Sequence, residues 1–377
     1  MRRTCLALPV VWGCGFQHGA LNTEVVLDDG GITVDVDAPP ADTRVDTPDS
    51  QTCFGAGLFV DCYDAGLEPT GAHEPSGTID TTMNASCTRV VQQMNGPELC
   101  LRTAGSITIS TLVRYRGTRP IVLLASDSIT VTETGTIEVS STRTTGPGAG
   151  ANTGDCDAAE SGAPNTSPAA VAGAGGGGGG GFGTGGGNGG AGENVGGGDG
   201  GGSAALVLIR GGCPGARGGA SSAGQGGEGG NGGGAVYLIA GHSISIAGSV
   251  RANGRGGNGA PNKAGGGGGG AGGLIGLDAP SVSVTGMVMA NGGGGGEGGG
   301  RDQGGQDGDD PATWNDRADG GSTMNMGGDG GGGAFMTSGA QNGSNVGNGG
   351  GGGGGGAGRI RVYPAQSVSG MISPPAS

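Results

Sequence analysis

The sequence predicts an all-β protein: a parallel β-solenoid of short strands with inserted glycine-rich, polyglycine II-like segments, preceded by a small disulfide-rich module. Three observations predict this fold. Glycine supplies 101 of the 377 residues, whereas only 2 Trp, 4 Tyr and 5 Phe are present, so backbone hydrogen bonds must provide much of the stability. A motif of short alternating strands recurs along the chain, and glycine tracts follow it. Most of the cysteines stand in pairs close in sequence.

The N-terminus has the layout of a secretory signal, which we assign to residues 1–13. The segment MRRTCLALPVVWGCG begins with two arginines and continues with an apolar run too short to span a bilayer. A small residue, Gly13, precedes Cys14, as in a bacterial lipobox, although Trp12 departs from that pattern. We therefore expect Cys14 to carry the lipid anchor of an exported protein, with plain cleaved secretion as the alternative.

Residues 14–51 are expected to form an acidic, disordered tether. Aspartate recurs along this stretch, and Arg44 is its only basic residue. Like charges and a scarcity of aromatic residues disfavour a packed core. The aspartates could be calcium ligands, but a solvated spacer that separates a folded domain from a membrane is the simpler interpretation.

Residues 52–103 are interpreted as a cysteine-rich module. With Cys5 in the signal and Cys14 assigned to lipid, 8 − 2 = 6 cysteines remain, and an even number in an exported chain indicates disulfides. Six cysteines can pair in many ways, and proximity alone favours Cys53–Cys62, Cys87–Cys100 and Cys156–Cys213. A zinc site is the alternative, but the chain has no C-x2-C pair and only three histidines.

Residues 104–377 are predicted to form the glycine-rich β-solenoid. Four segments share one sequence pattern. Alternating apolar and polar residues are followed by a turn, by an apolar-Ser/Thr-apolar triplet, and then by a glycine and a last apolar residue. The segments start at Pro120, Gly234, Gly273 and Gly358. Alternation predicts short strands with one face buried, and repeated sets of three such strands are typical of a parallel solenoid. The glycine at the shared corner predicts crowding or a positive φ at four positions: Gly135, Gly248, Gly286 and Gly370.

The glycine tracts follow Asn253-Gly254 and Asn291-Gly292, which are typical turn dipeptides. Two arrangements of the tracts are compatible with the sequence: loose loops, or extended threefold helices whose N–H and C=O groups pair laterally. The recurring attachment point, and the cysteines Cys156 and Cys213 on either side of the longest tract, favour ordered bundles.

Several function classes are disfavoured. A net charge of −14 argues against nucleic acid as a partner, and R-G-G triplets in an aromatic-poor chain do not alter this. Matches to G-x-G-x-x-G are uninformative at this glycine content, so no cofactor is expected. The aspartates between Asp302 and Asp319 are interpreted as a solvated loop, with weak calcium binding as the alternative; we expect no metal site. No histidine has a triad partner, so no catalytic residue is expected.

Residues 104–377 resemble glycine-rich, PE-PGRS-like cell-surface lipoproteins of Gram-negative bacteria, although the Pro-Glu domain of true PE-PGRS proteins is absent. The tracts are similar to polyglycine domains of phage adhesins and of the ligand-binding ectodomain of anaplastic lymphoma kinase. The resemblance implies a non-enzymatic structural or adhesive role at the outer membrane or cell surface. It also implies membrane contact through lipid only, and envelope or extracellular matrix partners, either glycans or protein.

Two other functions are weighed against this one. A carbohydrate-binding or carbohydrate-active β-helix is the alternative, since such folds host lyases and hydrolases. Ice binding by a flat polyglycine face is a third hypothesis, disfavoured because the sequence lacks regular rows of threonine.

Overall fold

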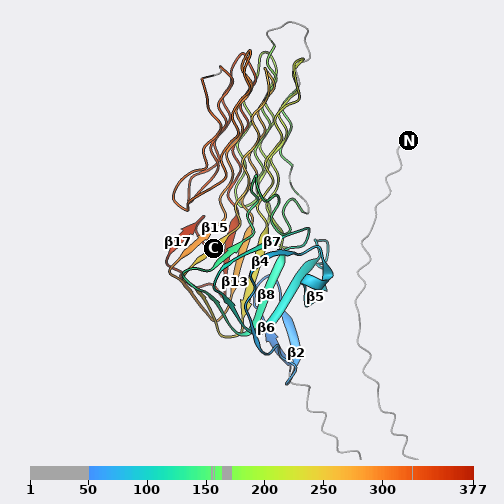
Figure 1. Cartoon of the computed structure of the whole chain (residues 1–377), viewed down its shortest axis with the longest axis vertical. Helices are drawn as coiled ribbons and strands as arrows, with labels where there is room; N and C mark the ends of the chain where they lie inside the picture. The colour runs from blue at the N-terminus through green and yellow to red at the C-terminus, as the bar shows by residue number, and fades with distance from the viewer. Residues whose placement is uncertain (1–50, 154–155, 157, 164–171, 325) are drawn as a thin grey trace, which may run out of the picture. The chain divides into compact units, whose positions relative to one another are not determined.

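The computed structural model describes residues 51–377 except 154–155, 157, 164–171 and 325 (Figure 1). The predicted signal, the anchor Cys14 and the tether as far as residue 50 lie outside the described residues. The chain divides into Met1–Pro48 and Asp49–Ser377, and everything below concerns the second unit.

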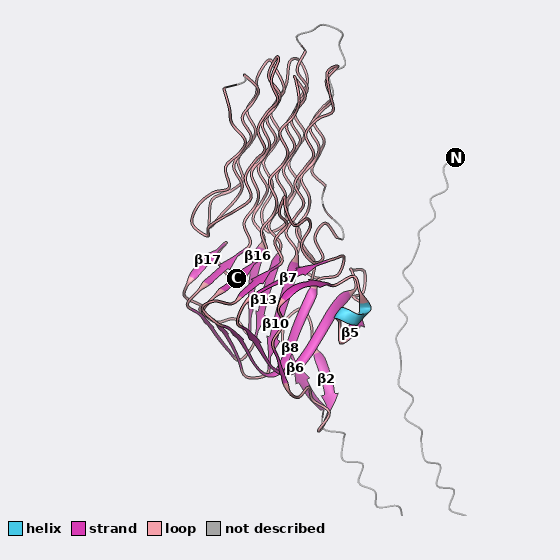
Figure 2. Cartoon of the chain, in the orientation of Figure 1, coloured by secondary structure: helices cyan, strands magenta, loops and turns pink. Residues whose placement is uncertain are grey.

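The described chain is nearly all β, with a single 3-10 helix, η1 (Asn84–Ser86) (Figure 2). Most strand pairs are parallel, which confirms the predicted all-β parallel class. Two pairs are antiparallel: β1 (Gln51–Phe54) with β2 (Asp61–Asp64), and β5 (Arg89–Val91) with β6 (Leu99–Ile109).

The parallel strands form three stacks. The first runs in the order β6, β8 (Ile121–Val131), β10 (Ala235–Ala240), β13 (Leu274–Asp278) and β16 (Arg359–Tyr363). The second joins β3 (Ala72–His73), the C-terminal halves of β6 and β8, β11 (Ser243–Ile246) and β14 (Ser281–Val284). The third runs β4 (Gly77–Asp80), β7 (Leu112–Arg116), β9 (Thr136–Glu138), β12 (Ser249–Arg251), β15 (Met287–Met289) and β17 (Met371–Ser373).

Consecutive strands contribute one member to each stack, and we call such a set a rung; β10, β11 and β12 form one. The long strands β6 and β8 each serve two stacks. Residues 121–125 of β8 pair with β10, and residues 128–131 pair with β11. The chain therefore changes direction between stacks. The register of β8 is the same with β10 and β11, whereas the pairing of β6 with β8 shifts by one residue between Ala104 and Ser106.

One apolar core lies between the three stacks. The residues predicted to point inward together, Val236 and Leu238 of β10, Ile244 and Ile246 of β11 and Val250 of β12, all belong to it and are at most 1% exposed. Alternating Ile and Val suit this position because branched side chains fill a pleated, half-buried surface.

The outer face of the first stack is also covered. Leu124, Tyr237 and Ile239 pack there against Phe54 of the β1–β2 hairpin and Ile209 of the glycine-rich region. The segment SAALVLIRGGC from Ser203 forms no strand, although its apolar run resembles a rung, because Ile209 packs on this outer face instead.

A buried carboxylate fastens the β1–β2 hairpin to this face. Asp278 accepts hydrogen bonds from the N–H groups of Ala56 and Gly57, both at 2.9 Å, and from the Tyr237 hydroxyl at 3.1 Å. Burial and the negative charge of Asp278 raise the pKa of Tyr237 above its usual value. The phenol therefore remains a neutral donor.

Three disulfides are present: Cys53–Cys62, Cys87–Cys100 and Cys156–Cys213, the pairings that proximity favoured. Cys100 lies in β6 opposite Ile121, so the second disulfide ties a short loop to the first stack. The predicted boundary at residue 103 falls inside β6, and β4 pairs with β7, so the cysteine-rich block shares strands with the stacks. β1 likewise begins at Gln51, the last residue assigned to the tether.

The corner glycines stand in a column. A Cβ atom on Gly248 would lie 2.1 Å from the Gly135 carbonyl oxygen, and one on Gly286 would lie 2.0 Å from that of Gly248. Among the four corner glycines, only Gly370 has a positive φ, of 137°. Close approach between rungs, rather than backbone conformation, therefore requires glycine at the first three corners.

Candidate functional site

Three glycine-rich excursions leave the strands at the same corner, after β9, β12 and β15. Their segments run side by side as extended chain with no strand assignment, in a bundle that projects from the side of the stacks where the excursions begin (Figure 1). The bundle holds most of the glycine-rich sequence and is the first candidate for a functional element.

The tract 265–270 shows how the bundle is built. Its N–H groups donate with a period of three: every third residue reaches the same neighbour, namely 216–219, 350–353 or 255–258. An extended chain with three residues per turn points its donors in three directions in this way.

The carbonyl oxygens of the same tract accept from three further neighbours, 227–230, 177–180 and 293–296. The tract therefore has six hydrogen-bonded neighbours drawn from all three excursions. Every N–H and C=O group of residues 265–270 is satisfied, which is what a buried backbone requires.

Only glycine fits inside this arrangement. A Cβ atom on Gly267 would lie 2.2 Å from the Glu228 carbonyl oxygen, and one on Gly268 would lie 2.0 Å from that of Gly178. Both distances are far inside van der Waals contact, so neither of these positions in the tract can carry a side chain.

A polar ladder marks the corner where the second and third excursions begin. Asn253 Oδ1 accepts from the N–H of Asn291 at 2.8 Å, and Asn291 Oδ1 accepts from the hydroxyl of Ser373 at 2.6 Å. Ser140 Oγ accepts from the N–H of Asn253 at 2.9 Å. These four residues are at most 4% exposed.

The ladder corrects the interpretation of Asn253 and Asn291 as turn residues. Neither asparagine has a positive φ, and neither lies in a turn. Their side chains carry hydrogen bonds from rung to rung at the point where the backbone leaves the stack. Sequence reasoning could have found this signal, because two asparagines at the same place in successive repeats suit such a ladder.

A buried glutamate in the bundle also joins neighbouring segments through side-chain hydrogen bonds. Glu297 interrupts a glycine tract and is fully buried, and its carboxylate accepts from the N–H of Gln306 at 2.8 Å and from the N–H of Thr323 at 3.0 Å. The Thr323 hydroxyl adds a further bond at 2.8 Å. Glu297 therefore links three segments, a role that its surroundings of glycine did not reveal.

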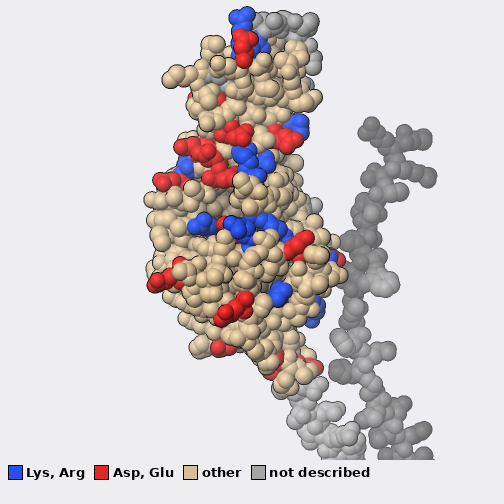
Figure 3. Space-filling view, in the orientation of Figure 1, with Lys and Arg blue, Asp and Glu red and all other residues tan. Residues whose placement is uncertain are grey.

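The aspartates between 302 and 319 lie partly along a shallow groove on the bundle, with a volume of about 500 Å³. Asp307 forms an ion pair with Arg143 at 3.1 Å and accepts from the N–H of Gly259 at 2.8 Å, while Asp310 accepts from the N–H of Gly256 at 2.8 Å. Figure 3 shows acidic and basic side chains grouped in bands across this face. The carboxylates of Asp307 and Asp310 therefore link neighbouring segments of the bundle. The described residues contain no group of three or more His, Cys, Asp or Glu placed to hold a metal ion.

Two of the three histidines considered as catalytic candidates, His73 and His242, lie in the described residues. His242 is exposed in the turn between β10 and β11, as expected of a surface residue. His73 lies 3.2 Å from an Arg102 nitrogen, and burial, together with that positive charge, lowers the pKa of His73. His18 lies outside the described residues.

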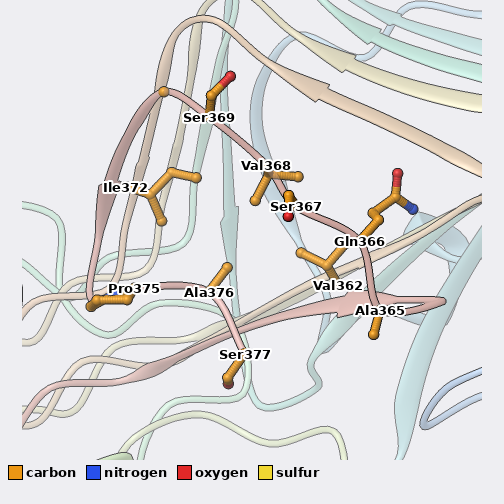
Figure 4. Close-up of a pocket in the computed structure, with 11 residues that line it drawn as sticks. Val362, Ala365, Gln366, Ser367, Val368, Ser369, Ile372, Pro375, Ala376 and Ser377 are labelled. Carbon is orange, nitrogen blue, oxygen red and sulfur yellow. The ribbon is translucent and has the colours of Figure 1, made fainter.

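The last rung has an apolar hollow of about 440 Å³ (Figure 4). Val362, Val368, Ile372 and Ala376 line it, and its lining has no charged side chain. The N–H of Ser377 donates to the Ile360 carbonyl at 3.0 Å and folds the end of the chain across β16. The hollow offers packing but no group for acid–base chemistry.

No family model, curated protein or solved structure matches the chain. Within the described residues, no helix has the length and apolar character needed to cross a membrane.

Proposed function

We propose that this protein is a non-enzymatic structural or adhesive component of a bacterial cell envelope. Its folded part is a parallel β-solenoid that carries a polyglycine II-like bundle, and the acidic tether joins it to a lipid on Cys14. On this proposal the chain belongs with PE-PGRS-like surface lipoproteins, at the outer membrane or cell surface, and its partners are envelope or matrix components.

The observation that carries this proposal is the bundle with six neighbours around one tract. Such a bundle is suited to be a rigid rod, because every backbone N–H and C=O group of residues 265–270 is hydrogen-bonded and a Cβ atom on Gly267 or Gly268 would meet a carbonyl oxygen. The glycines of this tract offer neither acids, bases nor nucleophiles, and the one carboxylate described inside the bundle, that of Glu297, is taken up by hydrogen bonds to Gln306 and Thr323. It is suited to spacing and display, and three disulfides suit an oxidising location outside the cytoplasm.

The anchor is tested by changing Cys14→Ser in the full chain expressed in a Gram-negative host. Wild-type protein is expected in membrane fractions and to incorporate labelled fatty acid, whereas the variant is expected in soluble fractions without label. Cys5→Ser is the matched control, because Cys5 lies within the predicted signal and should not affect either result. Identical fractionation of wild type and Cys14→Ser, without label on either, would contradict the anchor.

The display role is tested on the same cells. Intact cells are treated with a protease and with a membrane-impermeant label, and their retention on surfaces coated with envelope glycans or matrix proteins is measured. Protection from both reagents would contradict surface display, and retention equal to that of cells lacking the protein would contradict adhesion to those coatings.

A further inference from the structure

The outer face of the second stack carries a regular array of hydroxyl groups. Four segments occupy equivalent positions in successive rungs: SITIS from Ser106, SITVT from Ser128, SISIA from Ser243 and SVSVT from Ser281. Their second and fourth residues are Ile or Val and belong to the core. The first, third and fifth residues point outward, because side chains alternate along a strand.

Eleven of these twelve outward positions are Ser or Thr, and the exception is Ala247. They fall into three columns because the register stays constant: Ser128 pairs with Ser106 on one side and Ser243 on the other, and Ser243 pairs in turn with Ser281. The array is exposed or half-buried at every outward position. The sequence lacks regular rows of threonine, as stated above, but rows that mix Ser and Thr appear when the rungs are stacked.

The hydroxyls of the array are available to a ligand. Only two of them have a side-chain hydrogen bond within the described structure: Ser128 to the Asp127 carboxylate, and Thr132 to the Ile109 carbonyl and the Thr134 hydroxyl. The face also carries no charge, although the chain has 18 basic and 32 acidic residues. An exposed strand face would ordinarily use charged side chains for solubility.

We infer that this array binds ice. The strands place hydroxyls about 4.8 Å apart across the stack and about 6.7 Å apart along each strand. In a tetrahedral water lattice with O–H···O bonds of about 2.75 Å, second-neighbour oxygens lie about 4.5 Å apart and the layers repeat after about 7.3 Å. Centred on four rungs and three columns, the mismatch displaces the outermost hydroxyls by about 0.45 Å across the stack and about 0.6 Å along the strands, or about 0.75 Å at the corners, which rotation of Ser and Thr side chains absorbs.

Other ligands fit the array less well. Sugar rings stack on aromatic side chains, and the anchors of protein interfaces are Trp, Tyr and Arg. None of the twelve positions carries any of these residues. Ice is a neutral, two-dimensionally repeating surface of donors and acceptors, so it matches the array in charge, in hydrogen bonding and in period. The inference goes beyond the proposed envelope role, because a secreted form without lipid would bind ice equally.

The test uses the full mature chain and a single ice crystal. Wild-type protein is expected to adsorb, to hold the crystal below its melting point without growth, and to slow recrystallisation. Ser245→Lys places a long charged side chain at the centre of the array. It is expected to reduce the thermal hysteresis, the difference between the melting and freezing temperatures of the crystal, by at least about tenfold, because an unpaired charge would have to be desolvated. Ser245→Thr keeps the hydroxyl and is expected to retain activity.

Met371→Lys is the matched control, because Met371 is 36% exposed at an outward position of β17 in another stack. It should retain wild-type activity, and calorimetry should show equal melting temperatures for the two lysine variants. If Ser245→Lys melts lower than wild type, Ser283→Lys replaces it. Absence of ice adsorption by wild type, equal loss in Met371→Lys, or full activity in a folded Ser245→Lys would each overturn the inference.

Discussion

Replacing Gly267 and Gly268 by valine should unfold the bundle. Each new Cβ atom would meet a carbonyl oxygen, at 2.2 Å for Gly267 and 2.0 Å for Gly268, and those oxygens belong to segments held in place by their own hydrogen bonds. Neither oxygen lies on a side chain that could rotate away. The neighbouring segments must therefore separate.

The magnitude follows from the contacts that are lost. The two residues donate two backbone hydrogen bonds and accept two more. At about 0.5–1.5 kcal/mol each, these bonds contribute about 2–6 kcal/mol, and overpacking at two sites adds about 2–6 kcal/mol. The sum, about 4–12 kcal/mol, is comparable with the whole stability of a typical domain. For a unit of this size, the lower figure corresponds to a fall in Tm of about 6 °C.

Scanning calorimetry measures this effect, and amide exchange locates it. The control is Gly339→Val with Gly347→Val, two positions in the same bundle where an added Cβ meets nothing within 4 Å. The control should melt within a degree or two of wild type. Equal Tm values for the two double variants, with rapid exchange across residues 265–270, would refute the packing described here.

Two further predictions concern the covalent and polar supports. Without reductant the folded chain should show no free thiol among its six paired cysteines. Reduction should lower the free energy of unfolding by about 2–4 kcal/mol for each bridge, measured by denaturant unfolding. Ready thiol labelling of the oxidised protein would argue against the bridges. Asn291→Ala should lower the free energy of unfolding by about 1–3 kcal/mol, because the hydroxyl of Ser373 loses its buried acceptor. Asn262→Ala, whose side chain makes no hydrogen bond in the described structure, should be nearly neutral, and equal effects of the two alanines would contradict the ladder.

Much of the strand architecture could be predicted from alternation. The repeats at Gly234 and Gly273 became the rungs of β10 and β13 because their Ile, Val and Leu residues occur every second position. The rung that begins at Leu99 was missed, although it contains SITIS, because no glycine stands at the corner that follows this segment, where the four predicted repeats have one. Proximity in sequence was a sound guide to the disulfides because two of them close short loops.

The remaining features depend on register, which a single sequence does not display. Asn253 and Asn291 look like turn residues until the rungs are stacked and their side chains are seen to form a ladder. The hydroxyl columns likewise emerge only when Ser128 and Ser243 are placed side by side. The six neighbours of the central tract come from segments up to about a hundred residues away, and no local pattern identifies such partners.

The interleaving of the three excursions sets an order of assembly. The tract 265–270 needs partners from 177–180, synthesised before it, and from 350–353, synthesised long after it. Contacts of such long sequence separation form slowly and only when both partners are present. A chain whose C-terminal segments have not yet been synthesised therefore cannot complete its bundle. A truncated chain that lacks residues 350–353 would leave the donors of Gly266 and Gly269 unpaired, so the bundle itself distinguishes finished chains from incomplete ones.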